Sequence, residues 1–168
     1  MWSSEVTNMI ITGIWETLYM TLVSTLVGYV IGLPMGIILT VSDKDGIKPN
    51  AVLYKILDVI ANIVRSVPFI ILLVLLIPFT RLVVGKSYGS TATIVPLVIA
   101  AAPYIARMVE SSLKEVDAGV IEAARSMGAS NFTIITKVML VEARTSLLVG
   151  ATITLGTIRC LLTGRTNM

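Results

Sequence analysis

The side chains that carry most enzyme chemistry are scarce in this sequence. Its 168 residues include no histidine and one cysteine, Cys160. A zinc centre, histidine-based acid–base catalysis and an internal disulfide are therefore excluded, because each needs ligands or partners that the chain lacks. The acidic residues form no convergent catalytic set. We predict that the chain is not an enzyme and holds no metal ion.

One short motif resembles a nucleotide site but does not satisfy its full pattern. Gly85-Lys86-Ser87 matches the end of a phosphate-binding loop, which also requires a glycine five positions earlier, where this chain has Thr80. We therefore expect no ATP binding by this chain. The net charge of +3 is small and scattered, so nucleic acid is not expected as a partner.

The composition assigns the chain to the membrane. Hydrophobic residues make up 55% of it and charged residues only 14%, against roughly 25% charged residues in soluble domains. A spanning helix needs about 20 mostly uncharged residues. Candidate spans are 17–41, 59–80 with one interruption at Arg65, 87–106, and a marginal stretch from 145 to 158 or 162. We predict an all-α membrane protein with about four transmembrane helices in a single domain over 1–168.

Basic residues set the orientation, because connections rich in Lys and Arg stay on the inner side of a membrane. Residues 1–16 contain none, the predicted inner connections contain eight, and the predicted outer connection contains two. We therefore expect a multi-pass protein with its N-terminus outside. The inner side would then hold a short connection around 43–48 and a long one over 107–144.

Small residues recur every fourth position in the first span. Residues at this spacing lie on one face of a helix, where small side chains let another helix approach closely. The row predicts a helix-packing groove, and the alternative is that this groove belongs to a moving interface. Its members are Ser24, Gly28, Gly32 and Gly36.

Arg65 is the charged residue inside the second predicted span. If that span begins near residue 59, Arg65 lies close to the inner end, where its long side chain can reach the headgroups. The alternative is a pathway or structural charge that faces a wet cavity or pairs with a carboxylate such as Glu16.

The long connection over 107–144 is soluble in character, with five basic and five acidic residues. Asp117 is placed to cap a helix, Gly128 to end it, and Ser130 to cap a second one. The sequence predicts a helix-turn-helix at the membrane surface. One face of the first helix carries an apolar stripe that the spans, the bilayer or another protein must cover: Val116, Val120, Ala124 and Met127.

The same segment carries a spaced motif. Glu122-Ala123-Ala124 is followed after three positions by Gly128, after nine more by Val138, and after one more by Leu140. This spacing resembles the EAA loop of bacterial ABC importer permeases, E-A-A, x3, G, x9, I, x, L-P. The resemblance implies that these six residues form a cytoplasmic coupling segment, which docks in a cleft of a separate ATPase subunit.

The resemblance extends over roughly residues 10–155 to the permease subunits of the bacterial methionine importer. It implies an inner-membrane protein that forms the translocation path for an amino acid, with methionine as the expected substrate. It also implies a homodimer in contact with membrane lipid, a cytoplasmic ATPase subunit that binds the ATP, and an extracytoplasmic substrate-binding lipoprotein. No cofactor is expected in this chain.

Two departures from the family pattern bear on function. Val141 stands where the family has proline, and a second proline near Thr145 is also missing, so no local signal breaks the chain before the fourth span. Similarity fades in a divergent tail over 156–168, where the family has a fifth span. The alternative interpretation is therefore a truncated remnant that does not transport, or a membrane protein that only docks the ATPase.

Overall fold

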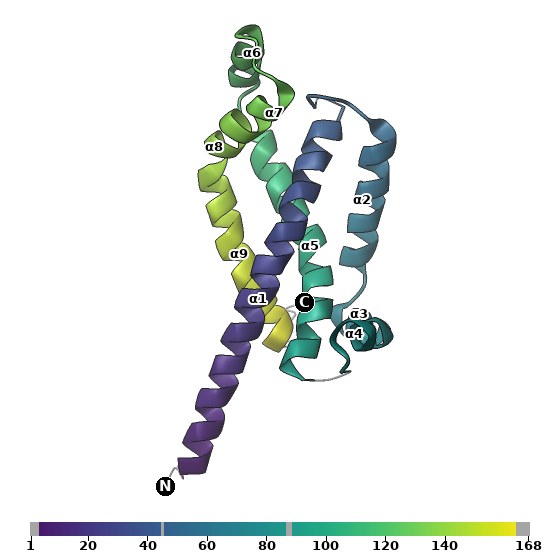
Figure 1. The fold of residues 1–168 in the computed structure, drawn as a ribbon, viewed down its shortest axis with the longest axis vertical. Coiled ribbons are helices and arrows are strands. Elements are labelled where there is room, and N and C mark those ends of the chain that lie inside the picture. Colours follow the sequence, from purple (N-terminus) through teal and green to yellow (C-terminus); the bar gives the residue numbers. More distant parts are fainter. Residues whose placement is uncertain (1–3, 45, 87–88, 164–168) are drawn as a thin grey trace.

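The computed structural model describes residues 4–44, 46–86 and 89–163, and every regular element among them is a helix (Figure 1). This confirms the predicted all-α class. The elements are α1 (Ser4–Ser42), α2 (Ala51–Ser66), α3 (Phe69–Leu75), α4 (Ile77–Val84), α5 (Ser90–Lys114), α6 (Ala118–Ser126), α7 (Asn131–Thr133), the π-helix η1 (Ile134–Met139), α8 (Leu140–Glu142) and α9 (Arg144–Thr163).

Two helices in the described ranges, α1 and α5, are long and apolar enough to cross a membrane unbroken. Two further crossings are possible if bent helix pairs count as one span each: α2 with α3, bent by 103°, and the run Asn131–Glu142 with α9, bent by 67°. The prediction of about four spans therefore corresponds to two straight helices and two bent pairs. The first two residues of the predicted span 87–106 lie outside the described residues.

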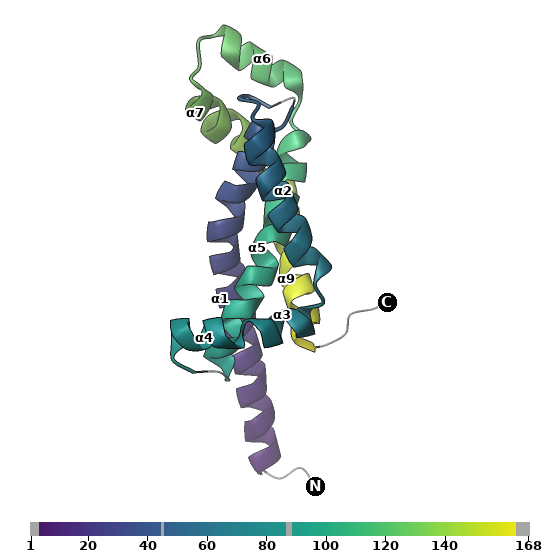
Figure 2. The ribbon, with the colours of Figure 1, turned by 90° about the vertical axis from the view of Figure 1, so that its right-hand side faces the viewer.

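The candidate span over 59–80 is divided among α2, α3 and α4. Helix α2 begins eight residues earlier, at Ala51, where the side chain of Asn50 caps it by accepting a hydrogen bond from the backbone N–H of Leu53. It ends at Ser66 because Val67, which precedes Pro68, takes an extended conformation. The short helices α3 and α4 then run across the end of the bundle (Figure 2).

The bend before α9 forms without a proline. Ala143, at the bend, is buried in the core although no helix-breaking residue is present there. Helix α9 then continues through residues 156–163, so this part of the divergent tail is helical. The rest of the tail, 164–168, lies outside the described residues.

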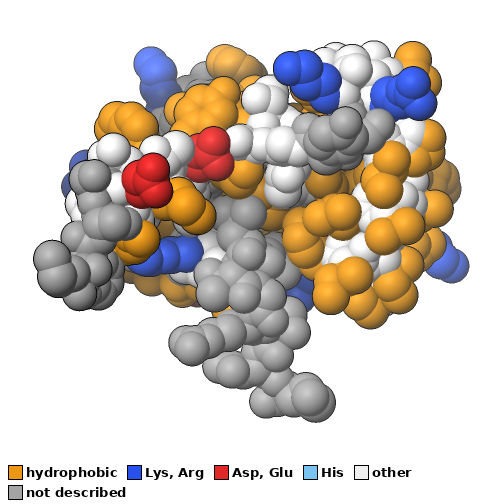
Figure 3. Space-filling view, turned by 90° about the horizontal axis from the view of Figure 1, so that it is seen from below, with side chains coloured by type: hydrophobic (Ala, Val, Ile, Leu, Met, Phe, Trp, Pro, Cys, Tyr) orange, Lys and Arg blue, Asp and Glu red, His pale blue; other side chains and the backbone are white. Residues whose placement is uncertain are grey.

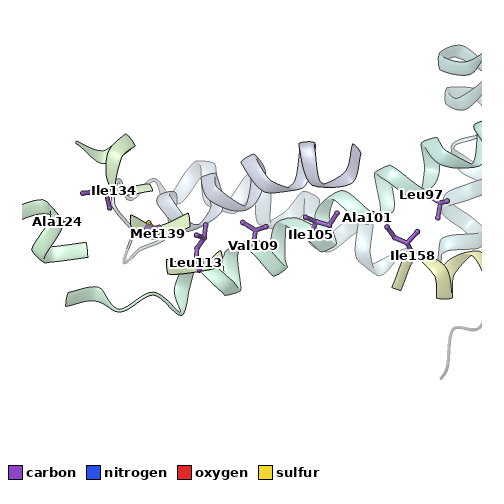
Figure 4. Packing of buried hydrophobic residues seen from close by; sticks show 10 residues of the cluster. Leu97, Ala101, Ile105, Val109, Leu113, Ala124, Ile134, Met139 and Ile158 are labelled. Atoms are coloured by element: carbon purple, nitrogen blue, oxygen red, sulfur yellow. The ribbon is translucent and has the colours of Figure 1, made fainter. Parts of the chain in front are cut away.

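The core lies along α5, which packs between α1, α2 and α9 (Figures 1 and 2). Its buried apolar residues recur every fourth position and form one row: Leu97, Ala101, Ile105, Val109 and Leu113. Figure 4 shows this row continuing toward Met139, Ile134 and Ala124. A single apolar core therefore joins the helical bundle to α6 and η1.

The outer surface of the bundle is apolar as well. On α1, Leu22, Leu26 and Val30 are exposed, and hydrophobic side chains cover much of the end view in Figure 3. A soluble monomer rarely exposes so much contiguous apolar surface, whereas lipid tails solvate it well. The start of α1 and the helix α6 lie at opposite ends of the molecule (Figure 1), so a membrane around the bundle separates them.

Candidate functional site

Helix α6 projects beyond the ends of α1 and α2 (Figures 1 and 2), and local hydrogen bonds fix where it begins and ends. The Oδ1 atom of Asp117 accepts a 2.6 Å hydrogen bond from the backbone N–H of Gly119 and so caps the helix. Gly128 ends it with φ +79°, a conformation that glycine adopts at little steric cost. Ser130 then caps α7 by accepting a 3.3 Å hydrogen bond from the N–H of Thr133. The predicted helix-turn-helix and its three boundary residues are confirmed.

The turn between the two helices is a Schellman motif. The N–H of Gly128 donates to the carbonyl of Arg125 at 3.0 Å, and the N–H of Ala129 donates to the carbonyl of Ala124 at 3.1 Å. These bonds satisfy carbonyls that the helix end would otherwise leave free. The direction in which the chain leaves α6 therefore depends on the backbone of Gly128.

The six motif residues point in two directions. Glu122 and Ala123 are exposed on α6, whereas Ala124 is only 5% exposed and belongs to the core. Val138 and Leu140 are half-buried and pack against that same core. Glu122 and Ala123 are therefore available to a partner, while the other apolar members attach the segment to the bundle.

The predicted apolar stripe is split in the same way. Val116 and Ala124 face the core, but Val120 is 42% exposed and Met127 is 81% exposed. Phe132, on α7, is 75% exposed and was not singled out from the sequence. Exposed apolar residues at the tip of a projection from the bundle are typical of a surface that another protein covers.

A cluster of charged residues lies between α5, α2 and the end of α1, and sequence reasoning missed it. Its centre is Glu110, which is 4% exposed. The carboxylate accepts hydrogen bonds from Arg107 Nη1 at 2.7 Å, Lys114 Nζ at 2.8 Å and Tyr54 Oη at 3.2 Å. We call Asp43, Tyr54, Asp58, Arg107, Glu110 and Lys114 the charged cluster.

The outer members of the charged cluster complete its pairing. Arg107 also forms an ion pair with Asp58, and Lys114 Nζ lies 2.6 Å from Asp43 Oδ2. The hydrogen bond from Lys114 lowers the pKa of the Asp43 carboxyl below its ordinary value. Because α5 continues to Lys114, the residues Arg107, Glu110 and Lys114 lie on its last turns and not in a loop after it. These three residues are three and four positions apart in the sequence, a spacing that could have predicted that they share one face of a helix.

The polar pairing continues down the interface between α2 and α5. The side-chain amide oxygen of Asn62 accepts a 3.5 Å hydrogen bond from Arg107, and the guanidinium carbon of Arg65 lies 6.0 Å from the ring centre of Tyr104. Arg65 stands in the last turn of α2, at the end away from α6. The expectation that Arg65 lies close to the start of its span is therefore wrong, because α2 begins at Ala51 and not near residue 59.

The row of small residues on α1 lies directly against α5. A Cβ atom added to Gly32 would lie 2.8 Å from the carbonyl oxygen of Ala102, and one added to Gly36 would lie 2.6 Å from that of Ala106. A Cβ on Gly28 would meet Ile105 at 2.9 Å. Ser24, the first member of the row, is fully buried. Contacts this close leave no room for any side chain at these glycines.

The chain is similar to known transport proteins over most of its length. The family model described as binding-protein-dependent transport system inner membrane component matches residues 32–159. The D-methionine transport system permease protein MetI of Escherichia coli strain K12 is 54% identical over 150 residues, which cover 89% of this chain and 69% of that protein. The methionine import system permease protein MetP of Bacillus subtilis strain 168 is 47% identical over 158 residues, covering 92% and 71%.

Solved structures share the fold. A native crystal form of the inward-facing MetNI methionine ABC transporter contains a chain that is 52% identical, with a TM-score of 0.92 over 94% of this chain and 73% of that one. A crystal structure of an amino acid ABC transporter with histidines reaches a TM-score of 0.70 over 95% of this chain and 73% of that one. At 22% identity, that second structure shows a common fold alone.

Proposed function

The chain belongs to the binding-protein-dependent transport system inner membrane components, and we propose that it is the permease subunit of an ABC importer for methionine. Two copies would form the translocation path. A separate ATPase subunit would bind and hydrolyse ATP on the cytoplasmic side, and an extracytoplasmic lipoprotein would deliver the amino acid. The names and identity of the methionine transport relatives support this assignment.

The observation that carries the proposal is the way α6 is held. Glu122 and Ala123 face outward from the tip, where a partner could contact them, while Ala124 belongs to the core that runs along α5. A force applied to α6 therefore reaches the spanning helices through packed side chains. ATP-driven motion of a partner could in this way bias a bundle between two arrangements.

The positions of basic residues support an orientation in the membrane. The end of the molecule that bears α6 also carries Lys44, Lys48 and Lys55 near the junction of α1 and α2, in agreement with the excess of basic residues on inner surfaces. We place this end in the cytoplasm and the start of α1 outside. The chain itself would perform no catalysis, since hydrolysis takes place in the partner.

Reconstitution tests the proposal. The permease, its cognate ATPase and its binding lipoprotein would be combined in proteoliposomes, and uptake of radiolabelled methionine would be followed with and without ATP. We expect uptake that requires all three components, and ATP hydrolysis that rises when loaded binding protein is added. A complex that assembles but takes up no methionine in the presence of ATP would contradict the proposal.

A further inference from the structure

Arg65 differs from the other cations at the interface of α2 and α5. Arg107 and Lys114 each pair with two carboxylates. Within the described ranges of the chain, no carboxylate lies at ion-pair distance from Arg65, and its recorded partner is the ring face of Tyr104. A guanidinium group on an aromatic face keeps its hydrogen-bond donors free for another ligand.

The contact with Tyr104 places the exposed side chain of Arg65 partway along the length of α5. Tyr104, against which it lies, is 10 residues from Lys114 and 14 from Ser90, the two ends of α5. At about 1.5 Å per residue this is roughly 15 Å from the end of α5 that carries the charged cluster. Charged residues at such depth are retained where they face a pathway or a counter-ion.

Arg65 opens onto a pocket of about 280 Å³ between α2, α3, α5 and α9. This is close to the lower limit of about 300 Å³ for small-molecule sites, a size that suits a single amino acid. Phe69, Leu72 and Ile158 form apolar walls, and the polar lining includes Arg65, Tyr104 and Thr157. One cation among apolar walls matches a ligand with one anionic group and an apolar side chain.

The break after α2 leaves a backbone carbonyl at the helix end without its intrahelical donor. Residue 68 is proline and has no N–H, so the carbonyl of Val64 loses the donor that a continuous helix would provide. Val64 lines the same pocket. A helix-end carbonyl without its intrahelical donor can accept from an ammonium group, and a guanidinium group can bind a carboxylate. These are the two charged groups of a free amino acid.

We propose that this pocket binds the transported amino acid and that Arg65 holds its carboxylate. The inference rests on the proposed function and adds a location for the substrate inside the membrane. The thioether side chain would lie against the apolar walls. A phospholipid headgroup is the competing anion, but it belongs at the membrane surface and not halfway along α5.

Equilibrium binding tests this assignment. The purified complex of permease and ATPase would be placed in nanodiscs without the binding protein, and bound radiolabelled L-methionine would be displaced by unlabelled L-methionine or by L-methionine amide, which lacks the carboxylate. In the wild type, we expect the amide to compete at least about tenfold more weakly, since a charge-assisted pair is lost. Equal competition by the two ligands would overturn the inference and leave a lipid as the partner of Arg65.

Variants separate recognition from general charge effects. Arg65→Gln should bind methionine at least about tenfold more weakly, and methionine and its amide should displace the bound label almost equally well. Arg65→Lys should keep part of the preference for methionine over the amide. Arg81→Gln, the same change at an arginine on α4 that does not line this pocket, should keep the wild-type preference. Retained preference in Arg65→Gln, or its equal loss in Arg81→Gln, would contradict the assignment.

The uptake assay distinguishes this inference from the proposed function. A wild-type complex that transports methionine with ATP but does not discriminate against the amide would exclude Arg65 as the carboxylate site while the importer function stands. A complex without ATP-driven uptake would contradict the importer function and the inference that depends on it.

Discussion

Nη1 of Arg107 donates a 2.7 Å hydrogen bond to Oε2 of Glu110, three residues later on α5. The same carboxylate accepts a hydrogen bond from the hydroxyl group of Tyr54 on α2. It also pairs with Lys114, which in turn pairs with Asp43 just after α1. One buried acidic group therefore fixes three segments at the end of the bundle from which α6 projects. Charge pairing and the apolar core together hold this end rigid.

Loss of the central carboxylate should destabilise the protein. Glu110→Ala leaves Arg107 and Lys114 without their shared acceptor, and we expect the free energy of unfolding to fall by about 2–3 kcal/mol. This is less than the loss for a fully buried pair, because the side chain of Lys114 is 43% exposed. Thermal denaturation of the detergent-solubilised protein measures the effect. Glu142→Ala, at an exposed acidic residue, should change the melting temperature little, and a similar loss in both variants would argue against a specific role of Glu110.

The row of small residues on α1 offers a matched pair of substitutions. Gly32→Ala places a Cβ 2.8 Å from a backbone carbonyl oxygen of α5, so α1 and α5 must separate, at about 1–3 kcal/mol. Ser24→Ala removes a buried hydroxyl group that finds no hydrogen-bond partner among the described residues, and it should be neutral or stabilising. Melting temperatures of the two variants check this. Equal destabilisation would show that the close contact at Gly32 is not what matters.

Two adjacent alanines on α6 should respond differently to a large side chain. Ala123→Trp changes an exposed position, so the permease should fold normally but bind the ATPase at least about tenfold more weakly, because an indole group blocks close docking. Ala124→Trp must fit into the core and should reduce the yield of folded permease. Co-purification with the ATPase and size-exclusion profiles separate the two effects. Leu82→Trp, at an exposed residue on α4, controls for bulk, and wild-type ATPase binding by Ala123→Trp would remove Ala123 from the interface.

The turn at Gly128 should be sensitive to backbone changes alone. Gly128→Pro cannot adopt φ +79° and loses the N–H that donates to Arg125, so ATP-driven uptake should be abolished while membrane insertion remains. Gly128→Ala meets no atom within 4 Å, and its cost is the conformational strain of roughly 1–2 kcal/mol. Its uptake should therefore be intermediate. Gly85→Ala, which creates the same strain on α4 with φ +77°, should transport normally, and unchanged uptake in Gly128→Pro would count against coupling through α6.

Acid should weaken the contact between Asp43 and Lys114. Because Lys114 lowers the pKa of Asp43 in the folded protein, the stabilisation is fully present above the ordinary aspartate pKa of about 3.9 and is lost as the pH falls through the lower folded value. Asp43→Asn should therefore melt below the wild type at pH 7, by an amount of about 0.5–1 kcal/mol typical of a solvent-accessible pair. The two melting temperatures should converge as the pH falls below that folded value. A constant difference over this range would exclude ionisation of Asp43 as the cause.

Local signals in the sequence were sufficient for several features. Asp117, Gly128 and Ser130 set the boundaries of α6 and α7 through their own backbone preferences and side-chain oxygens, and these do not depend on distant residues. The long uncharged runs of α1 and α5 were visible because a membrane-spanning helix needs only length and hydrophobicity. The motif around Glu122 likewise identified the segment that projects from the bundle.

Other features depend on contacts between distant parts of the chain. Nothing near Arg107 or Glu110 in the sequence indicates that Asp58 and Tyr54 lie opposite, because that pairing follows from how α2 packs against α5. The bend at Ala143 has no local breaker and is set by core packing. The depth of Arg65 was misjudged because uncharged length does not reveal where α2 begins or that the chain turns by 103° after it. Composition and local preferences thus determined that this chain is a helical membrane protein with a projecting segment, whereas only tertiary packing decided which charges are neutralised and which one faces a pocket.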